Sequence, residues 1–147
     1  MQGTTARTVG LGLVLMLAGA WPTSEINAQT RSFDGTWNVS LYCPNEPGPR
    51  GALQYTYSFP AQIAGGIFRG EHGSPGAPGW LLLEGTIRSD GSAVFEARGL
   101  TGQPPQTHNN YQGGMPYAYH MTARFEGAQG TGVRTETRAC TATFTRQ

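Results

Sequence analysis

Three histidines are the side chains best suited to metal binding or general-base chemistry: His72, His108 and His120. Zinc sites in proteins hold their ligands at short spacings, and this sequence lacks the HxH, HxxxH and HExxH spacings. His120 falls on the polar side of an alternating segment, His108 lies in a long loop, and His72 follows Glu71. The pattern predicts exposed or loop histidines and no metal site. Catalysis would require His72 or His108 beside a buried carboxylate.

Nucleophilic and carboxylate catalysis also lack their sequence patterns. Ser74 stands in a GSPG sequence, which differs from the G-x-S-x-G motif and has no strand-to-helix turn around it. Glu84 and Glu96 lie opposite the apolar faces of their segments, so we expect them to meet solvent or arginines such as Arg98. We therefore predict that the chain is not an enzyme and uses no cofactor.

Tyrosines form a more suggestive set. Four of them fall on the apolar faces of two alternating segments: Tyr55, Tyr57, Tyr117 and Tyr119. A buried phenol hydroxyl needs a hydrogen-bond partner, so the four predict either an internal polar network or a pocket for a small ligand. Met115 and two aromatic loop residues would bound such a pocket. The candidate ligand-binding residues are Tyr55, Tyr57, Trp80, Tyr111, Tyr117 and Tyr119.

The elements that must position these residues are strands, because period-two alternation recurs along the chain and helical periodicity does not. The expected strands cover about 36–43, 53–59, 67–72, 80–87, 92–99, 117–126, 131–137 and 140–146. Pro60 indicates an edge position or a bulge after the second of them. Eight short antiparallel strands separated by glycine-rich turns indicate an all-β sandwich or closed barrel.

Cys43 and Cys140 are the two cysteines of the chain, and we expect them to form a disulfide. If they face each other on antiparallel strands, facing residue numbers sum to 183 (43 plus 140), and Trp37 meets Arg146. The pairs in between are apolar on both sides. Pairing the first strand with the last closes an eight-stranded antiparallel up-and-down barrel, which is the fold we predict. The alternative is a β-sandwich with the bridge between its two sheets.

A barrel of this topology sorts its connections into two groups. The tight turns lie at one end, and the loops 44–52, 73–79 and 100–116 lie at the other, beside the predicted disulfide. Long loops on a rigid barrel commonly carry binding sites. We call the end that carries the long loops the mouth, and we predict that it binds a small molecule. The alternative is a protein-binding module such as an inhibitor of a protease or lysozyme. The narrow width of an eight-stranded barrel favours a filled core over a hollow one.

Residues 1–28 have the features of a secretory signal, with an apolar run over 9–20 and a cleavage region that ends at Ala28. An earlier cut after Ala20 is the alternative. The apolar run is shorter than the roughly 20 residues that span a bilayer. We expect a periplasmic or secreted monomer made of one domain, 29–147, with no membrane span.

Charge excludes nucleic acid as the expected partner. Charged residues make up 13% of the chain, against about 25% in typical domains. All ten basic residues are arginines, they form no run, and the net charge is +1. The chain therefore lacks the basic patch that nucleic-acid binding requires, and we expect a small ligand or an exported or envelope protein as its partner.

Gly35-Thr36-Trp37 resembles the G-x-W opening of the calycins, which include the lipocalin and avidin barrels. In those families an arginine from near the C-terminus packs over the tryptophan, so the resemblance implies this role for Arg146. The residues after Trp37 depart from the avidin pattern, and biotin binding is not implied.

A larger part of the chain, from Phe33 to the end, resembles an uncharacterised family of small exported proteins from rhizobia-like alphaproteobacteria. The segments that carry the resemblance are FDGTW (33–37), FPAQ (59–62), GEHGSPGAPGW (70–80), PYAYH (116–120) and ARFEGAQGTG (123–132). The resemblance implies export and a single domain, and it provides no catalytic residues.

Overall fold

The computed structural model describes Gly3 and residues 31–46, 52–102, 113–136 and 138–147. The predicted signal segment, apart from Gly3, lies outside these residues. The folded part begins with a 3-10 helix, η1 (Arg31–Phe33), which is followed by eight strands. The strands are β1 (Gly35–Cys43), β2 (Tyr55–Ala64), β3 (Ile67–His72), β4 (Leu81–Ile87), β5 (Ser92–Leu100), β6 (Pro116–Glu126), β7 (Gln129–Arg134) and β8 (Thr141–Arg146).

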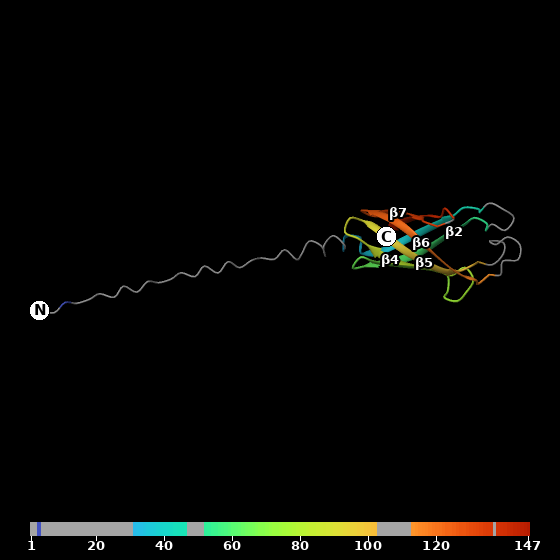
Figure 1. Cartoon of the computed structure of the whole chain (residues 1–147), viewed down its shortest axis with the longest axis horizontal. Helices are drawn as coiled ribbons and strands as arrows, with labels where there is room; N and C mark the ends of the chain where they lie inside the picture. The colour runs from blue at the N-terminus through green and yellow to red at the C-terminus, as the bar shows by residue number, and fades with distance from the viewer. Residues whose placement is uncertain (1–2, 4–30, 47–51, 103–112, 137) are drawn as a thin grey trace.

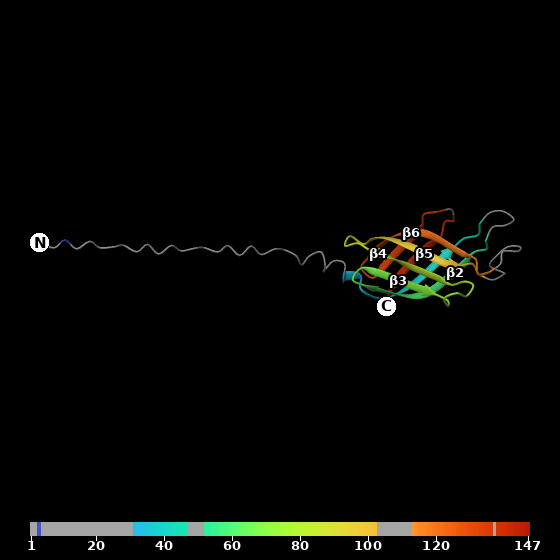
Figure 2. The ribbon, with the colours of Figure 1, turned by 60° about the horizontal axis from the view of Figure 1, so that its bottom comes forward.

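The strands form one closed antiparallel barrel, in the order β1 to β8, so each strand pairs with its neighbours in sequence (Figure 1). Figure 2 shows β3, β4 and β5 next to one another on one wall. The last ladder joins β8 to β1 and leaves the sheet without an edge. The predicted eight-stranded up-and-down barrel is thus confirmed, and the alternative β-sandwich is wrong.

Alternation of apolar and polar residues is the local reason for these strands, and glycine turns set their ends. In β1, residues Trp37, Val39, Leu41 and Cys43 are fully buried. Between β2 and β3, Gly65 and Gly66 both have positive φ, 59° and 79°, as a two-residue hairpin turn requires. Two-residue turns let strands extend closer to the turns than we predicted, since β2 continues to Ala64 and β7 begins at Gln129. At its other end β7 stops at Arg134, before the predicted 137.

Pro60 forms no bulge, which corrects one of the two alternatives expected from sequence, but it lies where the β3 side of β2 is unpaired, as the expected edge position requires. It faces Asn38 in a ladder of unbroken register between β1 and β2. On the other side of β2, the ladder with β3 begins only at Ala61. Proline cannot donate a backbone hydrogen bond, and at this position the lack of a donor leaves the ladder with β3 intact.

The ladder between β1 and β8 has the register that the cysteines predict. Trp37 faces Arg146, and Leu41 faces Ala142. The disulfide between Cys43 and Cys140 continues this register just beyond the ladder, with the two Cα atoms 4.2 Å apart. The covalent bond therefore fixes the pairing that closes the barrel.

The stagger of the strands makes the barrel narrow. Following facing residues once around all eight ladders from Ala64 leads back to β2 at Thr56, eight positions away (64 to 56). For a given strand number, stagger and tilt together fix the diameter of a barrel. A stagger of eight on eight strands is that of barrel cores which side chains fill completely.

Aromatic rings fill the middle of the barrel. Four phenylalanines are almost completely buried there, with ring centroids 4.7 to 6.4 Å apart: Phe68, Phe95, Phe125 and Phe144. Space for them comes from glycines on neighbouring strands. Gly85 faces Phe95, and a β-carbon at Gly85 would lie 2.5 Å from that ring. The middle of the barrel is therefore a solid core.

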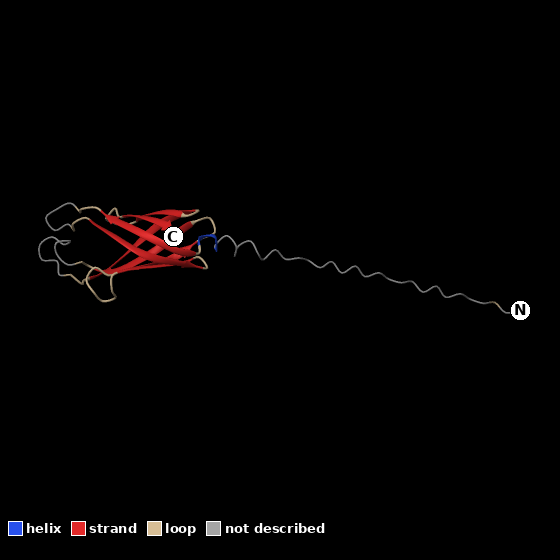
Figure 3. Ribbon diagram, turned by 180° about the vertical axis from the view of Figure 1, so that it is seen from behind, coloured by secondary structure: helices blue, strands red, loops and turns tan. Residues whose placement is uncertain are grey.

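The tight-turn end of the barrel is closed by η1 (Figure 3). The Trp37 indole Nε1 donates to the carbonyl of Phe33 at 2.9 Å, and the buried Phe33 ring packs against Phe125. Arg146 Nη2 donates to the carbonyls of Ser32 and Asp34, each at 2.7 Å. The Arg146 guanidinium also lies over the Trp37 ring, 5.4 Å from its centroid. These contacts close this end of the barrel with groups of the η1 region.

Reduction of the disulfide should strongly destabilise the chain. The bridge closes a segment of 97 residues, so its loss should lower the free energy of unfolding by about 4–5 kcal/mol in the chain-entropy treatment. That corresponds to a fall of roughly 15 °C or more in Tm, measured by circular dichroism with and without reductant. The matched control is Cys43→Ala/Cys140→Ala, whose Tm should not respond to reductant. An unchanged Tm on reduction of the natural chain would contradict the role assigned to the bridge.

Candidate functional site

Four tyrosines gather at the end of the barrel opposite η1. β2 begins with Tyr55 and Tyr57, and the first half of β6 carries Tyr117 and Tyr119; we call these four the tyrosine cluster. All four point inward and pack on the apolar core. The Tyr55 and Tyr57 rings lie 4.5 Å apart, and the Tyr117 and Tyr119 rings are parallel within 4° at 6.0 Å. The predicted inward orientation of the tyrosines is thus correct.

Tyr119 is the deepest member of the cluster. Its side chain is 2% exposed. Its buried hydroxyl forms no hydrogen bond with any residue that the structure describes. Buried polar groups in proteins are nearly always hydrogen-bonded, and an unsatisfied one costs about 1–3 kcal/mol. The Tyr119 hydroxyl can both donate and accept a hydrogen bond inside the barrel, and none of the described residues supplies its partner.

Two arginines accompany the tyrosines. Arg134 ends β7, faces Met121 of β6, and places its guanidinium carbon 4.2 Å from the centroid of the Tyr119 ring. Arg138 lies in the link between β7 and β8, with its guanidinium carbon 5.0 Å from the Tyr55 ring centroid. Cations over aromatic faces are attracted by the negative face of the ring. Both arginines thus bring positive charge to the tyrosine cluster.

Arg138 also braces the mouth. Its side chain is buried, and its guanidinium donates to the carbonyl of Pro44 at 2.8 Å and 2.5 Å and to that of Leu53 at 2.7 Å. These carbonyls stand where β1 ends and where the chain approaches β2. The Cys43–Cys140 bond lies beside them. Together the disulfide and Arg138 hold the bases of two connections at the mouth in place.

His72 lies inside the mouth, and the expectation of an exposed or loop histidine is wrong for this residue. It ends β3 on the inward side and stacks on Tyr57, with ring centroids 3.9 Å apart and planes within 8°. Its Nδ1 is 3.0 Å from the carbonyl oxygen of Gly79, to which it donates. Stacking and this bond fix the plane of the imidazole, which adds a polar edge to the wall of the site.

Burial keeps the tyrosine hydroxyls protonated. Desolvation raises the pKa of all four phenols of the cluster above the ordinary value, because the phenolate would lose its hydration. The positive charges of Arg134 and Arg138 act against this rise without reversing it. At neutral pH the cluster therefore offers neutral hydroxyls, which can donate hydrogen bonds.

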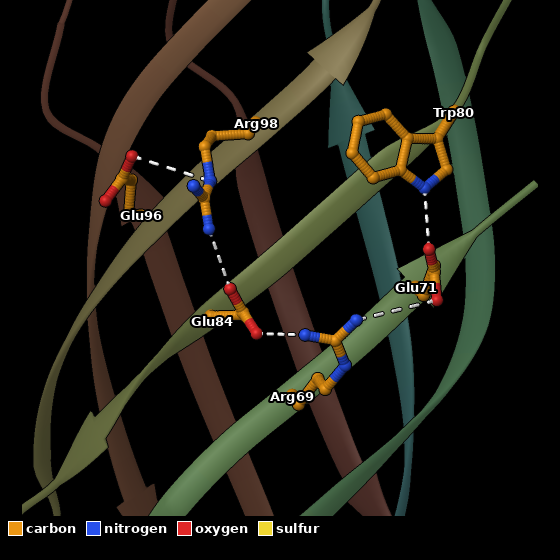
Figure 4. A network of polar contacts seen from close by, with 6 residues as sticks. All are labelled: Arg69, Glu71, Trp80, Glu84, Glu96 and Arg98. Atoms are coloured by element: carbon orange, nitrogen blue, oxygen red, sulfur yellow. Dashed lines mark hydrogen bonds and ion pairs between the residues drawn. The ribbon is translucent and has the colours of Figure 1, made fainter. Parts of the chain in front are cut away.

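Trp80 belongs to the outer wall, which corrects its assignment to the pocket. It stands just before β4, and its indole Nε1 donates to Glu71 Oε1 at 2.7 Å (Figure 4). Glu71 lies in turn beside Arg69 in a row of charged residues that crosses β3, β4 and β5. Tyr111, the other predicted aromatic loop residue, lies outside the described residues. Met115 is half exposed at the start of β6.

The same outer wall accounts for the carboxylates that could have suggested catalysis. Glu84 and Glu96 face each other across β4 and β5, and Arg98 lies between them, 2.9 Å from Glu84 and 3.7 Å from Glu96 (Figure 4). Arg69 pairs with Glu84 from the other side. Like charges in direct cross-strand contact repel each other, and the arginines offset this repulsion. The expectation that these glutamates meet arginines is confirmed.

His120 faces outward from β6, as predicted. Its Nδ1 lies 2.7 Å from Glu136 Oε1, and its backbone N–H donates to Glu136 Oε2 at 2.8 Å. The hydrogen bond from the His120 backbone N–H, together with that from the His120 ring, lowers the pKa of Glu136. This pair is largely exposed and stands on the outside of the barrel. His108 lies outside the described residues.

Arg134 and His72 are inward-facing residues that reasoning from sequence did not assign to the site although the sequence carried a signal for them. The signal is the alternation of inward and outward residues along each strand. Gly130 and Gly132 of β7 face inward, so Arg134, two positions further on, faces inward as well. In β3 the inward residues Phe68 and Gly70 predict the same orientation for His72. Each stands at the last position of a six-residue strand. The predicted strands include Arg134 within 131–137 and His72 at the end of 67–72, but neither side chain is assigned to the inward face in that prediction.

Comparison of the chain with known protein families, with curated proteins and with solved structures finds no match to any of them. In the described part of the chain, no three His, Cys, Asp or Glu side chains lie close enough together to hold a metal ion. Among the same residues, no helix is long and apolar enough to cross a membrane.

The buried phenols predict an abnormal alkaline titration. The phenols of the tyrosine cluster, whose pKa is raised in the folded chain, should resist ionisation at about pH 11, one unit above the ordinary pKa of about 10. Because the unfolded chain releases those protons more readily, the stability that they contribute is present below about pH 10 and is lost as pH rises. Phenolate absorbance should therefore rise together with unfolding. Ionisation of all six tyrosines while the chain remains folded would show that the cluster is solvated.

Proposed function

We propose that this chain is an exported, non-catalytic binding protein that takes up a small molecule at the long-loop mouth of its barrel. The observation that carries the proposal is the buried hydroxyl of Tyr119, which has no hydrogen-bond partner among the described residues. It lies among other polar groups rather than in the solid phenylalanine core. A ligand that hydrogen-bonds this hydroxyl would satisfy it.

The polar interior groups concentrate at one end of the barrel, which supports this location. The tyrosine cluster, His72 and the two arginines all stand on the side of the disulfide, whereas η1 closes the opposite end. Small-molecule sites combine apolar and aromatic walls with a few convergent polar groups. The mouth has this composition, and the brace formed by Arg138 and the disulfide would keep it in shape before a ligand arrives.

Export to the periplasm or the medium fits the same proposal. The disulfide is typical of proteins that work in oxidising compartments. The predicted signal over residues 1–28 supplies the route.

A second candidate function is binding of another exported protein at the outer rim of the mouth. The observation that favours it is a hollow of about 580 Å³ beside the loops, lined in part by Trp80, Leu82, Leu100 and Pro116. Met115 stands half exposed nearby. Aromatic and apolar side chains in such a hollow are typical anchors of protein interfaces.

Tyr119→Phe tests the ligand-binding proposal. Removing a buried hydroxyl that has no partner among the described residues should raise the stability of the ligand-free chain by about 1 kcal/mol, measured by urea unfolding. The same variant should lose the thermal shift that a bound small molecule gives in a screen against periplasmic metabolites. A destabilised variant would mean that the hydroxyl serves the fold, and it would contradict the proposal.

Tyr42→Phe is the matched control, because Tyr42 lies on the outer wall and its hydroxyl contacts only Gln54 among the described residues. It should leave every ligand-induced shift unchanged. Retention of a partner from envelope extract that depends on Trp80 and not on Tyr119 would favour the second candidate instead.

A further inference from the structure

We propose that two copies of this chain associate reversibly through the outer faces of β7, β8, β1 and β2, which together form an uncharged wall. The contact lies on the side of the barrel and not at its mouth, so it goes beyond the proposed function and does not depend on it. A reversible dimer takes the place of the monomer expected from the sequence.

Charged side chains occupy one half of the outer surface of the strands. All outward residues of β7, β8, β1 and β2 are described, and none of them carries a charge. The other four strands carry the row of ion pairs in Figure 4 and further charges on β6. Their outward charged residues are Arg69, Glu71, Glu84, Glu96, Arg98, Arg124 and Glu126. Because both halves pack on the same core, we attribute the difference to what each half meets outside the barrel.

Hydrogen-bonding side chains cover the uncharged wall in a regular grid. The central row crosses the four strands through Thr131, Thr143, Ser40 and Ser58, which face one another in consecutive ladders. Among the described residues, none of these four hydroxyls has a hydrogen-bond partner. The rows on either side consist of Val133, Thr141, Tyr42 and Thr56, and of Gln129, Thr145, Asn38 and Pro60. The wall therefore presents hydroxyls and amides that are free to bond to a partner.

A second copy of the same wall complements this chemistry. Hydroxyl and amide side chains both donate and accept hydrogen bonds, whereas a guanidinium only donates and a carboxylate only accepts. Such a wall matches its own copy across a two-fold axis, where residues close to the axis meet themselves. Charges in that place would repel their own copies, and this wall has none. The net charge of the chain is +1, so long-range repulsion between copies is also small.

A neutral polysaccharide is a less suitable partner for this wall. Sugar rings pack on exposed aromatic faces, as other flat apolar surfaces do. On the outward faces of these four strands, all of which are described, Tyr42 is the one aromatic side chain. The hydroxyl grid therefore favours a second copy over a glycan.

The size of the wall determines the strength of the contact. The four strands have nine, ten, six and six residues. At about 4.8 Å between strands and about 3.3 Å per residue, the wall measures roughly 19 Å by 26 Å, or about 500 Å². Stable interfaces bury about 800 Å² on each partner and contain more apolar surface than Tyr42 and Val133 supply. We therefore expect a weak dimer, with a Kd on the order of 0.1 mM.

Sedimentation equilibrium of the oxidised chain, from about 10 µM to about 1 mM, measures this association. The average mass should rise from that of a monomer towards that of a dimer. Thr143→Arg and Thr143→Asp should each remain monomeric, because each variant brings like charges together at the centre of the wall. An equal mixture of the two variants should associate at least tenfold more strongly than either variant alone, because opposite charges then meet.

Thr86→Arg is the matched control, since Thr86 is an exposed threonine on the outside of β4, in the charged half of the barrel. It should associate like the natural chain. Tyr119→Phe should also leave the association unchanged, so the contact between copies and the site at the mouth are tested separately. Circular dichroism of each variant establishes that the barrel is folded.

Four results would overturn the inference while leaving the proposed function of the mouth untouched. The first is a monomeric mass at every concentration. The second is association that both Thr143 variants retain, which would place the contact elsewhere on the barrel. The third is a mixture of the two variants that does not associate, which would exclude a two-fold contact at residue 143. The fourth is retention of a monomer on dextran that both variants abolish, which would assign the wall to a glycan.

Discussion

Antiparallel pairing of β1 with β8 is the interaction on which the rest of this structure depends. It turns an open eight-stranded sheet into a barrel, and its register gives the strands a stagger of eight residues. That stagger makes the interior narrow, so phenylalanines packed over glycines such as Gly85 fill the middle. The disulfide adds a covalent bond at one end of this pairing. Closure, packing and the location of the mouth all follow from one ladder.

The two ends of the barrel differ because different groups terminate the strands. At one end the Trp37 indole and the Arg146 Nη2 group donate to backbone carbonyls of the η1 region, while the buried Arg146 Nε has no hydrogen-bond partner among the described residues. At the other end the Arg138 guanidinium donates to backbone carbonyls, and the Tyr119 hydroxyl lacks a partner in the described part of the chain. A native interior tolerates such a group mainly where it is used. The Tyr119 hydroxyl is the observation on which the proposed binding site at the mouth rests.

The fold was predictable because two independent signals agreed: alternation put apolar residues on one face of each segment, and the cysteines selected a register that pairs those faces. The site was predictable only in part. Alternation oriented the tyrosines correctly, but Trp80 precedes β4 after a glycine with φ of 85°, so no strand period determined its side. Arg138 lies between strands, and its partners are carbonyls 85 to 95 residues away in sequence. Such contacts depend on the closed barrel and have no local signal.

Hydrogen exchange of the β1 and β8 amides in the oxidised chain, followed by NMR, tests the central claim that this ladder closes the barrel. If it does, the amides that bond across it should exchange only through global unfolding, as slowly as those of the long ladder between β5 and β6. Exchange between β1 and β8 that is much faster than between β5 and β6 would mean an open sheet with two edges. In that case the narrow core, the closed end and the mouth would no longer be supported, because all three are inferred from closure of the barrel.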